Sequence, residues 1–112
     1  MEQCIFCKIV NKEAPAQIVH EDERVLAFKD IFPKAPVHIL IVPKKHIETV
    51  AHIGPDDKEL IGELFVVAKK IAKEQGVSET GYRLIFNIGR GAGQTVDHLH
   101  LHLLGGGKMP FA

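Results

Sequence analysis

Three histidines alternate with leucines near the C-terminal end of the chain, where residues 98–104 read His-Leu-His-Leu-His-Leu-Leu. Successive side chains of a β-strand point to opposite faces, so a strand here would place His98, His100 and His102 on one face and the leucines in a core. The imidazoles would be about 7 Å apart at each step and would span roughly 13 Å. One metal ion cannot bind all three, whereas a substrate lying along the strand can contact them. The pattern therefore favours catalysis over a three-histidine metal centre.

The alternative explanation of the three histidines is that they are ordinary polar residues on the solvent-exposed face of a strand. Lys, Glu and Thr satisfy a solvated face without special chemistry, so three histidines favour a functional site. Neutral imidazole is a competent nucleophile near pH 7, and its attack on phosphorus forms a phosphorus–nitrogen bond that water can cleave in a second step. Neighbouring histidines could orient the nucleophile and protonate the leaving group.

A glycine-rich loop, residues 89–95, precedes the histidine segment and reads Gly-Arg-Gly-Ala-Gly-Gln-Thr. Glycine admits positive φ and has no Cβ, so the backbone N–H groups of such a loop can approach an anion closely. The loop matches neither a Walker A pattern nor a dinucleotide-binding fingerprint, and a plain hairpin turn is the alternative interpretation. Because Gln94 and Thr95 would place hydrogen-bond donors beside the imidazoles, we expect a phosphate oxygen to bind there.

Cys4 and Cys7 form a Cys-x-x-Cys pair near the N-terminus. In a reducing compartment this spacing is more often a metal half-site or a redox motif than a structural disulfide. The mostly apolar run 5–10 fits a short helix whose turn would bring both thiols together. A metal half-site needs two further ligands from elsewhere in the chain.

The elements that must position these residues are a sheet and one long helix. The β-branched run 38–42, closed by Pro43, predicts a strand buried on both faces. The segments 18–20 and 25–28 flank a charged tetrapeptide and predict a hairpin. Strands are expected at residues 18–20, 25–28, 38–42, 82–88 and 98–104.

The helix is expected from about Asp56 to Gln75, with Gly76 as the residue that ends it. Apolar residues recur in it at three- and four-residue spacing and would pack on the sheet. These residues are Leu60, Ile61, Leu64, Phe65, Ala68, Ile71 and Ala72. Strands around one long helix predict an α+β domain with a mainly antiparallel sheet.

Length and composition agree with one compact unit. The chain has 112 residues, 46% of them hydrophobic, which predicts a single domain over residues 1–112. Fourteen basic and fourteen acidic side chains cancel, so no net field attracts nucleic acid or an anionic membrane non-specifically. Because no signal peptide and no long apolar run stand out, we expect a cytoplasmic protein that does not bind membranes.

On the signature His-x-His-x-His-x-x at residues 98–104, with apolar residues at each x, the chain resembles the histidine triad (HIT) family. The resemblance extends over residues 30–47, including the Ile-Val-Pro-Lys-Lys-His stretch 41–46, and to the Gly-Gly after the triad. These features look like the histidine triad nucleotide-binding protein branch, in its bacterial form with Cys-x-x-Cys. The resemblance implies a five-stranded sheet with a long helix and a short N-terminal helix. It also implies a homodimer with a continuous ten-stranded sheet.

The resemblance assigns a role to each candidate residue. It implies that His100 attacks the α-phosphorus of a nucleotide, that His102 contacts the phosphate and assists the leaving group, and that His98 and His38 support them. Asp30 would accept hydrogen bonds from the ribose. The phosphate or leaving group would be held by Asn87, Gly93, Gln94 and Thr95, and the base by Phe6, Ile9, Phe28 and Ile31. For the last four, core packing is the alternative explanation.

The resemblance also bears on the cysteines, because several bacterial relatives pair such a Cys-x-x-Cys with two histidines. The matching ligands here are Cys4, Cys7, His46 and His98. Such a closed Cys₂His₂ site would hold a structural zinc ion. Two buried thiols without metal are the alternative.

The first function hypothesis is therefore a purine nucleotide-binding hydrolase of the nucleoside phosphoramidase type. It would act through a nucleotidylated histidine, release nucleoside monophosphate and require no catalytic metal. Its partners would be purine nucleoside monophosphates and their phosphoramidates. The alternatives are a dinucleoside polyphosphate hydrolase and a non-catalytic, nucleotide-sensing or scaffolding dimer. A turnover assay separates them.

Overall fold

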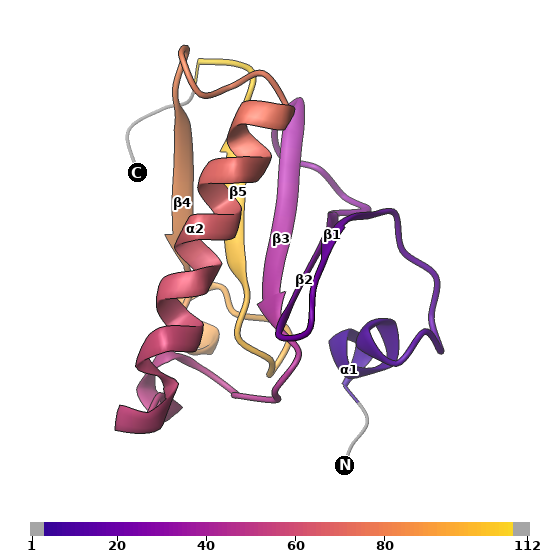
Figure 1. Ribbon diagram of the computed structural model, residues 1–112, viewed down its shortest axis with the longest axis vertical. Coiled ribbons are helices and arrows are strands. Elements are labelled where there is room, and N and C mark those ends of the chain that lie inside the picture. Colours follow the sequence, from indigo (N-terminus) through magenta and orange to yellow (C-terminus); the bar gives the residue numbers. More distant parts are fainter. Residues whose placement is uncertain (1–3, 109–112) are drawn as a thin grey trace.

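The computed structural model describes residues 4–108, which form a five-stranded sheet and two α-helices (Figure 1). The α-helices are α1 (Ile5–Val10) and α2 (Lys58–Glu74). The strands are β1 (Ile18–Glu21), β2 (Val25–Lys29), β3 (Val37–Pro43), β4 (Tyr82–Phe86) and β5 (Leu101–Gly105). Short 3-10 turns are η1 (Val50–His52), η2 (Pro55–Asp57) and η3 (Arg90–Ala92).

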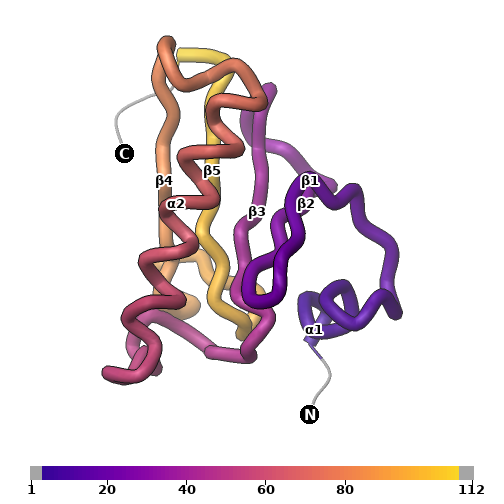
Figure 2. Tube along the Cα trace, viewed as in Figure 1, coloured from indigo at the N-terminus to yellow at the C-terminus, as the bar shows by residue number. Residues whose placement is uncertain are grey.

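The strands pair in the order β1-β2-β3-β5-β4, and every pairing is antiparallel. This confirms the α+β class, the antiparallel sheet, the long helix and the short N-terminal helix. Strand β3 lies at the centre and is buried from His38 to Pro43, as its continuous apolar run predicted. The chain path in Figure 2 shows how β5 lies between β3 and β4, although β4 precedes it in the sequence.

One face of the sheet packs against α2, which crosses it in Figure 1. Ala27, Ile41 and Leu101 are aligned across β2, β3 and β5, and all three belong to this core. The helix contributes its apolar face, including Leu64 and Ile71, which are fully buried. Leu99, Leu101 and Leu103 enter the same core, as their alternation with the histidines predicted.

The opposite face carries a smaller core and the histidines. Phe28, Leu40 and His102 are partner residues across β2, β3 and β5. Partner residues in a sheet project from the same face, so these three side chains lie on the same side of the sheet. Helix α1 packs on this face through Phe6 and Ile9. The long helix and the histidine cluster are therefore on opposite sides of the sheet.

A 3-10 turn leads into α2, and a glycine follows its last turn. The helix begins at Lys58 rather than Asp56, because Pro55 and Asp57 form a 3-10 turn in which Asp57 accepts a hydrogen bond from the N–H of Gly54 at 2.9 Å. At the other end Gly76 has φ +77°, a left-handed conformation that glycine adopts without strain.

The expected helix face is wrong at Phe65. Its side chain is 44% exposed and packs edge-on against Phe86 of β4, with ring centroids 6.1 Å apart. Helix α2 contacts the centre of the sheet most closely, at β3, so a residue on its flank reaches only the edge strand. Val67, which the expected pattern omitted, is buried instead.

The ends of two strands also differ from the prediction. Strand β5 begins at Leu101 rather than His98, because the N–H of Leu99 donates to the carbonyl of Ile47, in the loop after β3, at 2.6 Å. Strand β4 ends at Phe86 rather than Ile88, before Gly89 with φ +86° turns the chain into the glycine loop.

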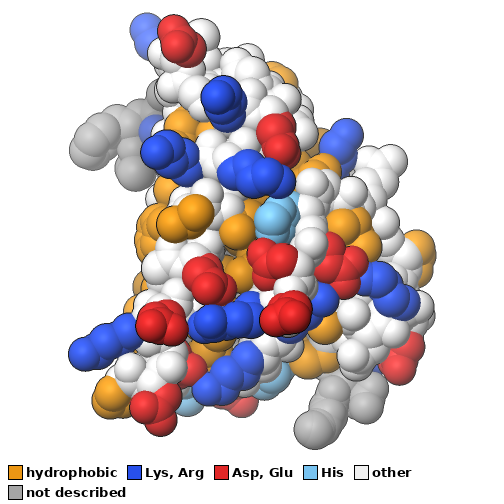
Figure 3. Space-filling model, viewed as in Figure 1, with side chains coloured by type: hydrophobic (Ala, Val, Ile, Leu, Met, Phe, Trp, Pro, Cys, Tyr) orange, Lys and Arg blue, Asp and Glu red, His pale blue; other side chains and the backbone are white. Residues whose placement is uncertain are grey.

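Charged side chains of both signs cover the face shown in Figure 3, over α2 and the β1–β2 hairpin. Ion pairs there include Arg24 with Glu63 and Lys70 with Glu74. Neither helix among residues 4–108 combines the length and the apolar character needed to cross a bilayer.

Candidate active site and metal site

A cavity of about 440 Å³ lies on the sheet face that carries α1. This volume is within the range of small-molecule sites. The predicted site residues among its lining are Phe6, Ile9, Phe28, Asp30, Ile31, Thr95, His100 and His102. The sequence analysis missed others, among them Ile5, Phe32, Leu40 and Val96. Leu40 could have been found from the pairing of β3, because it is opposite both Phe28 and His102.

The apolar wall is built around Phe6 of α1. Its ring meets those of Phe28 and His100 edge-on, at centroid distances of 5.4 and 5.0 Å. Phe6, Ile9 and Phe28 are buried in the smaller core and also line the cavity, so core packing accounts for their burial and they remain candidates for contact with a base. Ile31 is 79% exposed and lines the cavity from a loop.

His100 is oriented by the backbone of His98. Its Nδ1 lies 2.7 Å from the carbonyl oxygen of His98, and a carbonyl can only accept, so Nδ1 carries the hydrogen. The other ring nitrogen, Nε2, then holds a lone pair. Burial lowers the pKa of His100, which favours this neutral form at pH 7.

His38 and His102 form a hydrogen-bonded pair whose direction is set by the backbone of Lys34. The N–H of Lys34 donates to His38 Nδ1 at 3.0 Å, so a neutral His38 carries its hydrogen on Nε2. That Nε2 lies 3.0 Å from His102 Nδ1, which accepts and leaves the hydrogen of His102 on its Nε2. Burial lowers the pKa of His38 and lowers that of His102 to about 4. His102 is thus a neutral hydrogen-bond donor at pH 7.

Asp30 is the acidic member of the cavity lining. Its Oδ1 accepts a hydrogen bond from the N–H of Phe32 at 2.8 Å, and its Oδ2 lies 3.4 Å from His38 Nε2. Asp30, His38 and His102 are close enough together to be considered as metal ligands. The tautomer of His38 argues against this, because its Nε2 carries hydrogen and offers no lone pair.

The glycine loop uses most of its predicted ligands internally. Gln94 is 2% exposed, and its side chain accepts from the N–H of Gly89 and donates to the carbonyls of Glu48 and Val96. Asn87 donates to the carbonyl of Ala92 at 2.8 Å. The structure therefore does not bring the side chain of Gln94 beside the imidazoles, because the backbone groups of a compact loop need those hydrogen bonds.

Gly93 and Thr95 complete the account of this loop. Gly93 has φ +93°, a left-handed conformation that glycine adopts without strain, whereas a Cβ there would make only an ordinary contact, 3.9 Å from Asn87 Nδ2. Gly93 does not line the cavity, whereas the exposed Thr95 does.

His98 lies on the same side of the sheet as the other two triad histidines, because its ring meets that of Phe6 in α1 edge-on at a centroid distance of 6.0 Å. Its ring is buried, and its Nε2 donates to the carbonyl of Pro43 at 2.8 Å. Leu99, Leu101 and Leu103 all enter the core beneath α2, so the alternation extends to His98, although His98 precedes β5 and does not line the cavity. His98 instead belongs to a second cluster.

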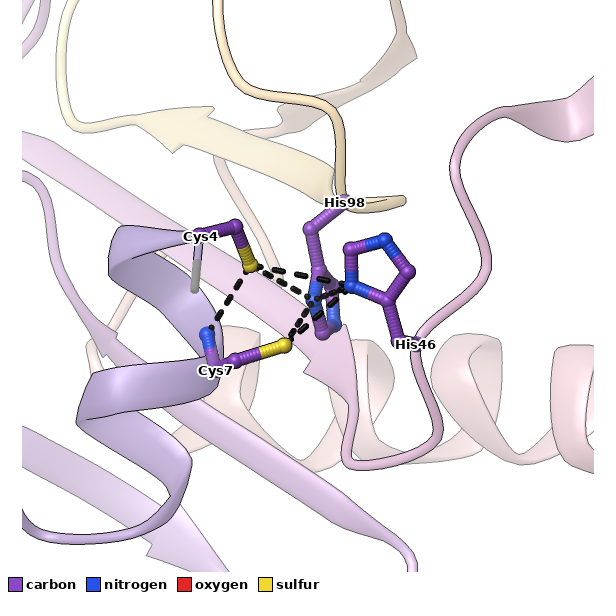
Figure 4. A group of neighbouring side chains, drawn as sticks. All are labelled: Cys4, Cys7, His46 and His98. Atoms are coloured by element: carbon purple, nitrogen blue, oxygen red, sulfur yellow. Dashed lines mark hydrogen bonds between the residues drawn. The ribbon is translucent and has the colours of Figure 1, made fainter. Parts of the chain in front are cut away.

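This second cluster consists of Cys4, Cys7, His46 and His98 (Figure 4). The four distances from a cysteine Sγ to a histidine Nδ1 range from 3.2 to 3.7 Å, and the two Nδ1 atoms are 3.2 Å apart. Four ligands at about 2.3 Å (sulfur) and about 2.0 Å (nitrogen) from a tetrahedral ion would be separated by about 3.5 Å. The four ligands therefore lie close enough together to bind a metal ion.

The protonation of His98 suits a metal ligand. Its Nε2 hydrogen is engaged by Pro43, so the Nδ1 that points toward the cysteines holds a lone pair. Burial lowers the pKa of His98 to about 4. Burial and the neighbouring Cys4 raise the pKa of Cys7 to about 11, so a bound cation is needed to hold this thiol as a thiolate at pH 7.

Comparisons with known proteins give consistent results. A family model described as "Scavenger mRNA decapping enzyme C-term binding" matches residues 3–111. Protein HitA of Neisseria gonorrhoeae is 46% identical over 105 residues, which cover 94% of this chain and 97% of that protein. The purine nucleoside phosphoramidase of Escherichia coli (strain K12) is 49% identical over 105 residues, which cover 94% and 88%. A HIT family hydrolase from Legionella pneumophila has a TM-score of 0.96 and 53% identity, with 97% of each chain covered.

The sheet, the histidines and the cavity beside them define the class of HIT-fold proteins. The chain belongs to the histidine triad (HIT) family.

Proposed function

We propose that this protein is a purine nucleoside phosphoramidase, a hydrolase that cleaves the phosphorus–nitrogen bond of a nucleoside 5′-phosphoramidate. The observation that carries the proposal is the unprotonated Nε2 of His100 at a cavity of nucleotide size, with the Nε2–H of His102 nearby. The 49% identity to the Escherichia coli enzyme of that name supports it.

The reaction proceeds in two displacements. His100 Nε2 attacks the α-phosphorus, a phosphorus–Nε2 bond forms, and the bond to the substrate nitrogen breaks. The leaving nitrogen keeps the electron pair and takes up a proton from His102 Nε2, after the His38–His102 pair has taken up one proton from solvent, so that a neutral pair remains. Water then attacks the phosphorus, the phosphorus–Nε2 bond breaks, and nucleoside monophosphate leaves. A proton from that water restores His102.

The nucleotide is held by the cavity lining. The purine lies between the apolar side chains of Phe6, Ile9, Phe28 and Ile31, and the ribose hydroxyls donate to Asp30. The phosphate is placed beside Thr95 and the backbone of the 93–95 segment. Asn87, Gly93 and Gln94 support this segment from within the loop.

The metal that fits the Cys₂His₂ cluster is zinc, held by Cys4, Cys7, His46 and His98. A closed four-ligand site is structural, and it supplies stability rather than a reacting group. It would fasten α1, whose Phe6 and Ile9 line the cavity, to the loop after β3 and to His98.

The protein forms a homodimer through β4, giving a continuous ten-stranded sheet. Strand β4 is at the edge of the sheet, where its outer backbone groups can pair with another strand. Phe65 and Ile88, each more than 40% exposed, lie on α2 and directly beyond β4. Light scattering during gel filtration measures the mass, and a monomer would contradict the dimer.

The experiment that tests the function is steady-state hydrolysis of an adenosine phosphoramidate beside diadenosine tetraphosphate. His100→Ala serves as the blank, and His52→Ala, which replaces an exposed histidine elsewhere, serves as the matched control. Preference for the phosphoramidate, lost only in His100→Ala, supports the proposal. Preference for the dinucleotide favours a polyphosphate hydrolase, and binding without turnover of either favours a sensor.

A further inference from the structure

His38, His102 and Asp30 lie together at the cavity, where His38 and His102 share a hydrogen bond and a carboxylate oxygen of Asp30 lies near the same nitrogen of His38. His38 Nε2 lies 3.0 Å from His102 Nδ1 and 3.4 Å from Asp30 Oδ2. The N–H of Lys34 occupies His38 Nδ1, so the single N–H of the neutral ring is on Nε2 and has two acceptors within reach. Asp30 thus competes with His102 for one hydrogen.

The carboxylate of Asp30 is held between the histidine pair and the cavity. Phe32 donates its N–H to Oδ1 at 2.8 Å, and this bond directs Oδ2 toward His38. The side chain of Asp30 is 20% exposed and lines the cavity, whereas that of His38 is 3% exposed and does not. A group that binds Asp30 from the cavity therefore reaches His38 only through this carboxylate.

We propose that Asp30 is a positioning residue for the proton-donating pair His38–His102, a role beyond its contact with ribose. This inference rests on the proposed function. When ribose hydroxyls donate to Asp30, its Oδ2 no longer competes for the Nε2–H of His38, which stays on His102 Nδ1. The Nε2–H of His102 is then directed at the phosphoryl group. Recognition of ribose and orientation of the proton donor become one event.

The charge of Asp30 acts on the same pair. The charged and titratable groups that face His38 and His102 are Asp30, Lys34 and His100. Burial lowers the pKa of both rings, the cationic Lys34 lowers it further, and the anionic Asp30 raises it. Asp30 therefore favours positive charge on the pair, which helps it to provide a proton to a leaving nitrogen.

Nitrogen-15 NMR of the histidine rings tests the geometry without turnover. In native protein the spectra should show His38 and His102 each with hydrogen on Nε2. In Asp30→Asn, which keeps an acceptor for the N–H of Phe32, the pKa of both rings should fall. Asp22→Asn is the matched control. Asp22 Oδ2 lies 2.8 Å from His20 Nε2, and its Oδ1 accepts two backbone N–H groups. Neither Asp22 nor His20 lines the cavity. It should leave both rings unchanged.

Kinetics separate positioning from ribose binding. The substrates are adenosine 5′-phosphoramidate and its 2′,3′-dideoxy analogue, which cannot donate hydroxyl hydrogens to Asp30. If Asp30 acts only through ribose, Asp30→Asn and native protein will have equal kcat on the dideoxy analogue. Because the negative charge of Asp30 favours a protonated pair whether or not ribose hydroxyls are present, we expect kcat of Asp30→Asn to be lower by about tenfold or more on both substrates. Asp22→Asn should match native protein.

Equal kcat on the dideoxy analogue overturns the proposal, and so does an unchanged pKa of His38 and His102 in Asp30→Asn. If Asp30→Asn does not fold, Asp30→Ser keeps a short acceptor for Phe32 and is judged by the same measurements. Absence of phosphoramidate hydrolysis by native protein overturns the proposed function instead, and the NMR titration then decides the inference alone.

Discussion

Two histidine clusters lie side by side in this protein, and the same five-residue segment, 98–102, supplies both. His98 joins Cys4, Cys7 and His46, where four ligand atoms converge. His100 and His102 line the cavity. In the first cluster the side chains point lone pairs or thiols at a common centre. In the second, one ring presents a lone pair and the other a hydrogen.

The difference between the clusters comes from which ring nitrogen the surrounding chain engages. A carbonyl holds Nε2–H of His98 and leaves Nδ1 for a metal, whereas a carbonyl holds Nδ1–H of His100 and leaves Nε2 for attack on phosphorus. His102 accepts from His38 and retains its Nε2–H as a donor. Three identical side chains thus become ligand, nucleophile and donor through their hydrogen-bond partners.

The largest expected effect comes from removing the nucleophile. His100→Ala should lower phosphoramidate turnover by at least about 10³-fold, because no covalent intermediate can form. Binding of nucleoside monophosphate, measured by calorimetry, should largely remain because the apolar wall is intact. The exposed His52→Ala should behave like native protein. Retention of most activity in His100→Ala would falsify the assignment of the nucleophile.

Breaking the metal cluster should affect stability more than chemistry. Protein purified without chelator should contain about one zinc per chain, and Cys7→Ser should contain almost none. Chelation should lower the melting temperature of native protein but not that of Cys7→Ser, since zinc binding free energy contributes to folding. Mass spectrometry measures the zinc content, and calorimetry measures the melting temperature. Native protein that contains no zinc rules out the site.

Loss of the Gln94 side chain should weaken the support of the glycine loop. Gln94→Ala leaves the buried N–H of Gly89 and two carbonyls without this partner, which should cost about 1–3 kcal/mol of unfolding free energy. Urea denaturation measures the change. Gln17→Ala, at an exposed position, is the matched control. Equal denaturation midpoints for the two variants would show that the loop does not depend on Gln94.

Acidification should destabilise metal-free protein. Burial lowers the pKa of His98 and of His102 to about 4 in the folded protein, whereas both groups have their ordinary pKa of 6.5 in the unfolded chain. Between these values the unfolded chain binds more protons, so unfolding free energy falls as pH decreases from 6.5 toward 4. The slope is at most about 1.4 kcal/mol per pH unit for each ring. Urea denaturation midpoints, recorded between pH 4 and pH 6.5 in the presence of a chelator, measure how the unfolding free energy depends on pH. His102→Gln should reduce this dependence. A midpoint independent of pH contradicts the prediction.

Much of the fold was predictable because its signals are local. The continuous apolar run of β3 and the periodic face of α2 each reflect burial that repeats along one element. Phe65 was misplaced because periodicity defines a helix face but not where the sheet beneath it ends. A single domain over residues 1–112 stays a prediction, since residues 1–3 and 109–112 lie outside the described part of the chain.

The site was predictable to the level of residue identity but not of side-chain direction. The resemblance to the HIT family brought Asp30, Phe28 and His100 together as candidates, and the structure places them along one cavity. Gln94 was expected there too, but its donors are used within the loop. A polar side chain beside a site can serve the ligand or the backbone, and local sequence does not distinguish these uses.

The sequence by itself determined the antiparallel sheet, the long helix, the alternation that sends leucines into the core, and the set of histidines and cysteines that could react or bind metal. Only the tertiary structure decided which nitrogen of each of those histidines remains available. The reason is that some of the deciding partners are far away in sequence, such as the carbonyl of Pro43 for His98 and the side chain of His38 for His102. Local patterns encode burial, whereas the protonated nitrogen depends on what folding brings within hydrogen-bond distance.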